Sequence, residues 1–149
     1  MLDHSSEQLR QIAHNLMPGE LVKFGLVPAV NMLISQLAET ENNAQFYTHA
    51  MDDRLEPTKE IHIFRIIQEI VQNVIKHADA SNLDISITKH TQFVNILIED
   101  DGKGYDAEKV STGMGLTNIK SRITMLHGKL QINSEARKGT TFDISTPTS

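Results

Sequence analysis

Residues 58–78 form the longest amphipathic segment of the chain, and two strand-like segments follow it closely. Its apolar residues recur at steps of three and four, which predicts a helix with a wide apolar face. Residues 83–88 and 93–98 then alternate apolar and polar side chains, as half-buried strands do. Only a short turn separates these two strands, so we expect them to pair as a hairpin. The apolar face of the helix can be buried against the sheet that contains this hairpin.

The rest of the chain extends this pattern on both sides. Further helices are predicted over residues 1–17, 26–39 and 116–126, with Pro18 and Gly19 interrupting the chain after the first. Further strands are predicted over residues 45–51, 130–134 and 140–145. Strands close enough in sequence to pair directly favour a mixed or antiparallel sheet over a doubly wound parallel one. The predicted fold class is therefore an α/β two-layer sandwich, a mixed sheet with helices packed on one face.

Composition excludes several classes of function. The chain has 149 residues and a formal net charge of −5, which argues against general nucleic-acid binding. It has no cysteine, so disulfide scaffolds, thiolate zinc sites and cysteine nucleophiles are excluded. No apolar run approaches the roughly 18 residues of a membrane span. We expect a mildly acidic, cytoplasmic domain without membrane contact in this chain.

Four short motifs carry candidate chemistry. The first is the polar edge of the long helix, where a carboxylate, an amide and two potential cations share one face, a set that suits hydrated Mg²⁺ and phosphate. The second follows an apolar strand and places a carboxylate beside two glycines. The third puts glycines at a helix start, where amides favour phosphate. The fourth enters the last strand. Their residues are Glu69, Asn73, Lys76 and His77; Asp100, Gly102 and Gly104; Gly113, Met114, Gly115 and Leu116; and Gly139, Thr140 and Thr141.

Each motif alone has an ordinary structural explanation, as a solvated helix face or a surface turn. Their order is more specific: E-x-x-x-N, D-x-G-x-G, G-x-G-L and G-T, separated by helices and strands of suitable length. This order resembles the nucleotide-binding domain of the Bergerat-type ATPases, over about residues 42–147. The segments IIQEIVQNVIKHADA and GMGLTNIKSRI are similar to sensor histidine kinases that pair with helix-turn-helix response regulators. Residues 10–30 resemble the end of the second dimerization helix of such kinases and the exit from it.

The resemblance implies a role for each motif residue. Asn73 would be the Mg²⁺ ligand, and Glu69 would orient a water or act as base. Asp100 would read the adenine amino group, with Thr140 supporting the base. The other implied ATP-binding residues are Lys76 and His77 near phosphate, Gly102 and Gly104 beside the base, Gly113, Met114, Gly115 and Leu116 at the lid hinge and helix start, and Thr141. ATP and Mg²⁺ are the implied cofactors.

The implied function is the catalytic part of a two-component sensor histidine kinase. Residues 1–40 would be the end of the second dimerization helix with a linker helix, and residues 41–149 the ATP-binding catalytic domain. The acceptor motif of the first dimerization helix is not present, and His14 lies in the segment that resembles the second helix. We therefore expect this chain to bind ATP but to autophosphorylate poorly or not at all. Its implied partners are its own dimerization helices and a response regulator, with no direct nucleic-acid contact.

Two other functions remain open at this point. One is a protein-serine kinase of the anti-sigma type. Residues 8–30 favour the histidine kinase over it, because an anti-sigma kinase does not need an exit from a dimerization helix. The other is a nucleotide-sensing interaction module without transfer activity, although the intact Glu69, Asn73 and Asp100 weigh against a degenerate site.

Overall fold

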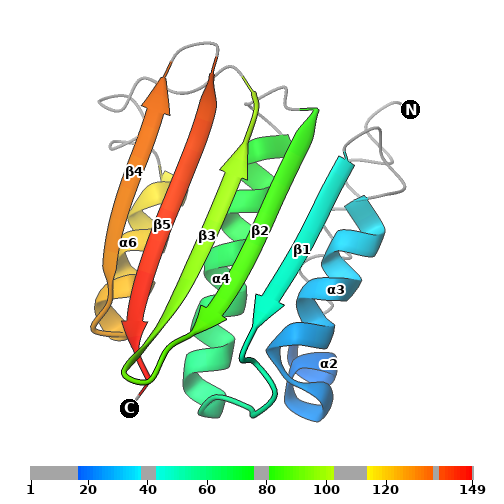
Figure 1. The fold of residues 1–149 in the computed structure, drawn as a ribbon, viewed down its shortest axis with the longest axis vertical. Coiled ribbons are helices and arrows are strands. Elements are labelled where there is room, and N and C mark those ends of the chain that lie inside the picture. Colours follow the sequence, from blue (N-terminus) through cyan, green and yellow to red (C-terminus); the bar gives the residue numbers. More distant parts are fainter. Residues whose placement is uncertain (1–16, 38–42, 76–80, 103–113, 136–137, 149) are drawn as a thin grey trace.

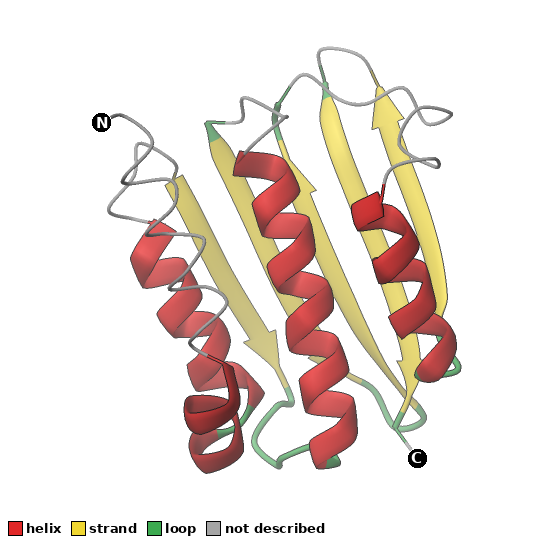
Figure 2. Cartoon of the chain, turned by 180° about the vertical axis from the view of Figure 1, so that it is seen from behind, coloured by secondary structure: helices red, strands yellow, loops and turns green. Residues whose placement is uncertain are grey.

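The computed structural model describes residues 17–37, 43–75, 81–102, 114–135 and 138–148. Five strands form one sheet in the order β1-β2-β3-β5-β4, in which β1 and β2 are parallel and all other neighbours are antiparallel. The helices among these described residues cover one face of the sheet (Figures 1 and 2). The elements are α2 (Met17–Phe24), α3 (Leu26–Leu37), β1 (Asn43–His49), α4 (Pro57–Asn73), β2 (Asn82–Lys89), β3 (Phe93–Asp100), α6 (Met114–Met125), β4 (Lys129–Glu135) and β5 (Gly139–Pro147). The predicted two-layer α/β sandwich with a mixed sheet is confirmed.

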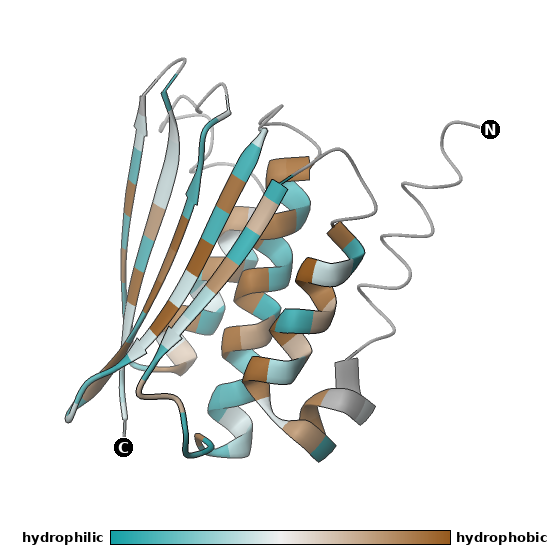
Figure 3. Cartoon of the chain, turned by 45° about the vertical axis from the view of Figure 1, so that its right-hand side comes forward, coloured by the Kyte–Doolittle hydropathy of each residue, from teal (hydrophilic) through white to brown (hydrophobic). Residues whose placement is uncertain are grey.

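The core lies between the sheet and the helices, as the alternation in the strands requires. Ile85 of β2 pairs with Ile98 of β3, which pairs in turn with Phe142 of β5, and all three side chains are buried. Because side chains two residues apart share one face of a strand, this register aligns a continuous apolar surface across the central strands. The apolar stripe of α4, which includes Ile63, packs on that surface, and polar side chains alternate with apolar ones along the strands (Figure 3).

The N-terminal helices belong to the same core. Leu21 of α2 and Leu26, Val30 and Leu33 of α3 are buried in one cluster with the sheet residues. Helix α3 lies beside α4 over β1 (Figures 1 and 2). The described part of residues 1–40 thus packs in the same helical layer as α4. The predicted division into a dimerization segment up to residue 40 and a catalytic domain from residue 41 stays a prediction.

Some predicted boundaries were wrong. Pro18 and Gly19 do not interrupt a helix but lie inside α2, where proline is tolerated in a first turn. Strand β1 ends at His49 rather than at residue 51, because Ala50 has a φ of 60°, a left-handed conformation that ends the extended run. Helix α4 ends at Asn73 and continues as a π-type turn to residue 75. Residues 1–16 of the helix predicted over residues 1–17 lie outside the described residues.

No helix in the described ranges is long and apolar enough to cross a lipid bilayer.

Candidate functional site

The structure brings the ends of four elements to one edge of the sheet. Strand β3 ends there at Asp100, and the antiparallel β5 begins beside it, with Asp100 in register with Thr140. Helix α4 ends at Asn73 and helix α6 begins at Met114 at the same end of the helical layer (Figures 1 and 2). Parts of all four sequence motifs therefore lie at one end of the molecule.

Asp100 is a carboxylate held in a mostly buried position, with 8% of its surface exposed. Its Oδ1 accepts a hydrogen bond of 2.9 Å from the Gly102 amide. Burial raises the pKa of Asp100, the Gly102 and Thr140 amides oppose that rise, and the charge of Asp101 adds to it. A carboxylate offers about four lone-pair positions. Asp100 can therefore accept a further N–H donor, such as an amino group of a purine base.

The start of β5 approaches Asp100 closely. Gly139 has a φ of 97°, and a Cβ atom added there would lie far inside the van der Waals distance of the Asp100 carbonyl oxygen. The next residue, Thr140, is 1% exposed, and its hydroxyl lies 3.0 Å from the Ser134 hydroxyl. Glycine at position 139 thus allows Thr140 to sit directly beside Asp100.

Thr141 is not brought together with these residues. The burial of β5 alternates, so that Thr140 and Phe142 face the helices while Thr141 is half-buried on the opposite face, opposite Glu99. The sheet itself separates Thr141 from Thr140. Its position gives no support to the predicted contact of its side chain with ATP.

Asp101 forms a different set of hydrogen bonds from Asp100, a difference that the sequence motif does not show. Its Oδ1 accepts hydrogen bonds from the Ser81 amide at 2.9 Å and from the Asn82 amide at 2.8 Å, and its Oδ2 accepts one from the Asn82 side chain at 2.6 Å. The hydrogen bonds from the backbone and side chain of Asn82 are the main reason why the pKa of Asp101 is lowered. Asp101 therefore fastens the end of β3 to the start of β2.

We expect Asp101→Ala to lower the free energy of unfolding by about 1 kcal/mol, a small value because the carboxylate is exposed to water. The Asp101 pKa is lowered in the folded chain, so the stabilisation is complete above the ordinary value of 3.8 and is lost as the pH falls through the folded pKa. Urea titrations of the parent protein and of Asp101→Ala, at neutral and at acidic pH, measure this difference in stability. A stability difference that persists unchanged at the lowest pH would contradict the assignment.

The polar edge of α4 supplies oxygen ligands. Glu69 and Asn73 are half-buried and lie one turn apart, so they share one side of the helix. The charge of Glu69 acts on the Arg65 guanidinium, whose pKa is lowered by burial and by Arg122 of α6. Glu69 therefore lies on the side of α4 that faces α6. Lys76 and His77, predicted on the same edge, lie outside the described residues.

These oxygens fit a hydrated magnesium ion. Mg²⁺ is usually bound through one or two protein oxygens, with water and phosphate completing its octahedron. Within the described ranges, no three His, Cys, Asp or Glu side chains converge into a closed metal cage. Two oxygen donors one helical turn apart, as Glu69 and Asn73 are, are compatible with an open site, and a π-type turn follows Asn73 directly.

The start of α6 offers backbone donors. The first four amides of a helix have no partner within it and carry partial positive charge, which favours phosphate. No acidic residue occupies the first turn of α6. Leu116 is buried in the core, so only its backbone can serve a ligand. Only the backbone is described for Met114 and Gly115, and Gly104 and Gly113 lie outside the described residues.

One buried charge was not predicted from the sequence. Glu60 is 2% exposed in the first turn of α4 and forms an ion pair with Arg54. A signal for it exists in the sequence, because Glu60 occupies the position in the apolar stripe one turn before Ile63 and Phe64. An acidic residue in the core stripe of a helix indicates a buried partner.

Comparison with known proteins gives one family. The family model described as histidine kinase-, DNA gyrase B-, and HSP90-like ATPase matches residues 58–149. The chain is 33% identical over 149 residues to the signal transduction histidine-protein kinase/phosphatase DegS of Brevibacillus brevis. It is 34% identical over 139 residues to the sensor histidine kinase ComP of Bacillus subtilis. The alignments cover 99% and 91% of this chain but only 39% and 18% of these relatives.

Solved structures show the same fold. A histidine kinase domain of the blue-light activated kinase of Erythrobacter litoralis has a TM-score of 0.66 at 16% identity, covering 83% of this chain and 65% of that one. The histidine kinase AdeS of Acinetobacter baumannii has a TM-score of 0.64 at 18% identity, covering 98% of this chain and 76% of that one. With the family model matched over more than half of its length, this chain belongs to the histidine kinase-, DNA gyrase B- and HSP90-like ATPases.

Proposed function

We propose that this chain is the ATP-binding catalytic part of a two-component sensor histidine kinase. The observation that carries the proposal is Asp100, a mostly buried carboxylate held by the Gly102 amide where α4 ends and α6 begins. A site of this kind can select adenine by its amino group and still leave the phosphates near two helix ends. The similarity to DegS and ComP supports the kinase class.

The residues divide the recognition of Mg·ATP between them. Asp100 accepts the adenine amino group, and Thr140 supports the base from β5. Asn73 holds the magnesium ion through its amide oxygen, and Glu69 orients a water beside it. Magnesium, when bound, neutralises charge on the phosphate oxygens. Amides at the start of α6 bind phosphate oxygens, as we also propose for Lys76 and His77.

The proposed reaction needs positioning more than covalent chemistry. A histidine nitrogen attacks the γ-phosphorus of ATP, a P–N bond forms, the bond from the γ-phosphorus to the bridging oxygen breaks, and ADP leaves with that oxygen. Donors fixed around the phosphates stabilise the charge that develops in this step. The acceptor histidine belongs to a dimerization helix that this sequence does not contain, so transfer needs that helix to be supplied.

The partners follow from the same proposal. The phosphoryl group passes from the histidine to an aspartate of a response regulator, which we propose to be of the helix-turn-helix class. The kinase acts as a dimer through its own dimerization helices, and this part of it works in the cytoplasm. Support comes from the segments IIQEIVQNVIKHADA and GMGLTNIKSRI and from the kinase names of the relatives.

We expect Asn73→Ala to remove the dependence of ATP binding on magnesium. In calorimetric titrations, wild-type affinity for ATP should rise on adding Mg²⁺, while the variant should bind ATP with about the same affinity in Mg²⁺ and in EDTA. Asn133→Ala on the exposed face of β4 is the matched control and should behave as wild type. An Asn73→Ala variant that keeps the full magnesium effect would exclude Asn73 as the ligand.

Transfer is tested with γ-labelled ATP and a separately purified pair of dimerization helices that carries an acceptor histidine. Label that is stable in alkali and lost in acid identifies phosphohistidine and supports the proposal. Acid-stable label on a serine would instead indicate a protein-serine kinase. ATP binding with no transfer to any acceptor helix would indicate a nucleotide-sensing module. These last two outcomes both overturn the proposed function.

A further inference from the structure

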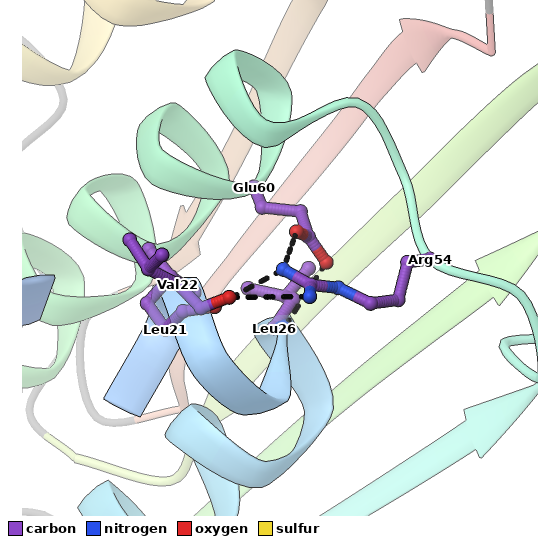
Figure 4. Close-up of polar contacts among 5 residues, drawn as sticks. All are labelled: Leu21, Val22, Leu26, Arg54 and Glu60. Atoms are coloured by element: carbon purple, nitrogen blue, oxygen red, sulfur yellow. Dashed lines mark hydrogen bonds and ion pairs between the residues drawn. The ribbon is translucent and has the colours of Figure 1, made fainter. Parts of the chain in front are cut away.

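At the end of α4 opposite to Asn73, an ion pair with a buried carboxylate links α4 to α2 and α3. Glu60 of α4 is almost fully buried, and its Oε1 accepts a hydrogen bond of 2.7 Å from Nη2 of Arg54, which lies in the connection between β1 and α4 (Figure 4). Arg54 is half-exposed at its side chain, whereas Glu60 is not. Glu60 raises the pKa of Arg54 through this bond, so the guanidinium keeps its charge.

Each partner of the pair also binds the end of a neighbouring helix. The Arg54 guanidinium donates to the carbonyl oxygens of Leu21 and Val22 in the last turn of α2, both at 3.2 Å. The other Glu60 oxygen, Oε2, accepts a hydrogen bond of 3.2 Å from the amide of Leu26, the first residue of α3. A cation at a helix C-terminus and an anion at a helix N-terminus are both favourable. Arg54 therefore caps the C-terminus of α2, and Glu60 caps the N-terminus of α3.

The corner between α2 and α3 is shaped around this pair. Gly25 has a φ of 92°, and its amide donates to the Leu21 carbonyl at 2.9 Å. A Cβ atom on Gly25 would lie 2.9 Å from Nε of Arg54 and 3.2 Å from Oε2 of Glu60. Position 25 thus needs glycine for its backbone and for the room that the ion pair occupies.

Apolar packing between α2 and α4 is incomplete at this place. A pocket of about 310 Å³ lies here. It is lined by Leu21, Val22, Arg54, Leu55, Pro57, Glu60 and Ile61. Val22 is 63% exposed and Ile61 is 37% exposed beside it. Leu21 anchors α2 in the core, and the directional bonds of the ion pair add to this attachment where the apolar contact is incomplete.

We propose that Arg54 and Glu60 are positioning residues that fix the direction of α2 on the ATP-binding layer. Asn73 lies thirteen positions after Glu60 in α4, about 20 Å along the helix, so the pair does not touch the nucleotide. The purpose of this arrangement rests on the proposed function, because α2 lies within residues 10–30, which resemble the end of a dimerization helix and its exit. Its fixed direction then sets how the ATP site faces the helices that carry the acceptor.

The chain contains no cysteine, so spin labels can be placed cleanly at Lys23→Cys in α2 and Asn133→Cys in β4. We expect one narrow distance distribution in the parent protein. In Arg54→Gln and Glu60→Gln the distribution should broaden at least about twofold, while ATP affinity stays within about twofold of the parent. Arg54→Lys should give an intermediate width, because an ammonium group cannot reproduce the fork of the guanidinium. Lys129→Gln on exposed β4 is the charge-matched control.

Amide exchange at Leu26 checks the same proposal when a label perturbs the corner. Exchange should become at least about tenfold faster in Arg54→Gln and Glu60→Gln, with exchange at Ile96 in the central strand unchanged. Narrow distances and a protected Leu26 amide in both variants would overturn the proposal. An equal loss of protection at Leu26 and Ile96, together with weaker ATP binding, would also overturn it, because that indicates general destabilisation. Failure of phosphoryl transfer leaves both measurements valid and refutes only the proposed function.

Discussion

Gly139→Ala is expected to lower the free energy of unfolding by about 2–5 kcal/mol, the sum of an unfavourable backbone conformation and overpacking. The φ of 97° at position 139 disfavours any residue with a Cβ atom. The added atom would overlap the Asp100 carbonyl oxygen and lie 2.8 Å from its carbonyl carbon. These are backbone atoms of β3, so relief requires β3 and β5 to move apart.

The matched control is Gly19→Ala in α2. Gly19 has no heavy atom within 4 Å of an added Cβ and lies in a helix, where alanine is favoured by about 0.5–1 kcal/mol. Urea denaturation should therefore place the two variants on opposite sides of the parent protein. A Gly139→Ala variant within about 1 kcal/mol of the parent would show that the two strands do not approach as closely as described.

Asp100→Asn should weaken ATP binding by roughly 10- to 100-fold, the loss of a hydrogen bond to a charged acceptor. The substitution keeps the size of the side chain, but an amide has only one acceptor oxygen. If that oxygen accepts from the Gly102 amide as the Asp100 carboxylate does, the amide nitrogen points its hydrogens at the amino group of adenine in the proposed binding mode. Whichever way the side-chain amide of the Asp100→Asn variant is turned, it therefore loses either the hydrogen bond from Gly102 or the proposed hydrogen bond from adenine.

Calorimetry with Mg·ATP measures this change, and the same titration with Asp101→Asn is the control. Asp101 carries the same charge one residue away, but its bonds go to Ser81 and Asn82, so its loss should change affinity by no more than about twofold. Unchanged melting of Asp100→Asn in the absence of nucleotide would separate a binding defect from unfolding. Equal loss of affinity in both variants would show a general effect of charge and not base recognition.

Periodicity was enough to predict the layers of this fold. The stripe of α4 and the alternation of β2, β3 and β5 are direct records of burial on one face, so the two-layer sandwich with a mixed sheet could be predicted. Helix α2 could not, because Pro18 and Gly19 are turn signals by local propensity. The helix forms despite Pro18 and Gly19 because tertiary packing, here the burial of Leu21 in the common core, outweighs local propensity.

The candidate site was predictable where chemistry lies in short motifs and not where it depends on geometry. Asp100 could be chosen from D-x-G-x-G, but the contrasting duties of Asp100 and Asp101 depend on which carboxylate meets Ser81 and Asn82 across the sheet. The placement of Thr141 on the far face depends on the register of β5. The pair of Arg54 and Glu60 joins elements 33 and 34 residues apart in sequence, and no local motif encodes such contacts.

The sheet order has a consequence for synthesis of the protein. Strand β5 is the latest described strand in the sequence, yet it lies inside the sheet between β3 and β4. Until the ribosome has released Gly139–Pro147, β3 has an open edge and β4 has no partner among the described strands. Open edges of apolar strands pair readily with other chains. The nascent chain thus depends on the arrival of its final described strand, and premature termination before Gly139 would leave an aggregation-prone half-sheet.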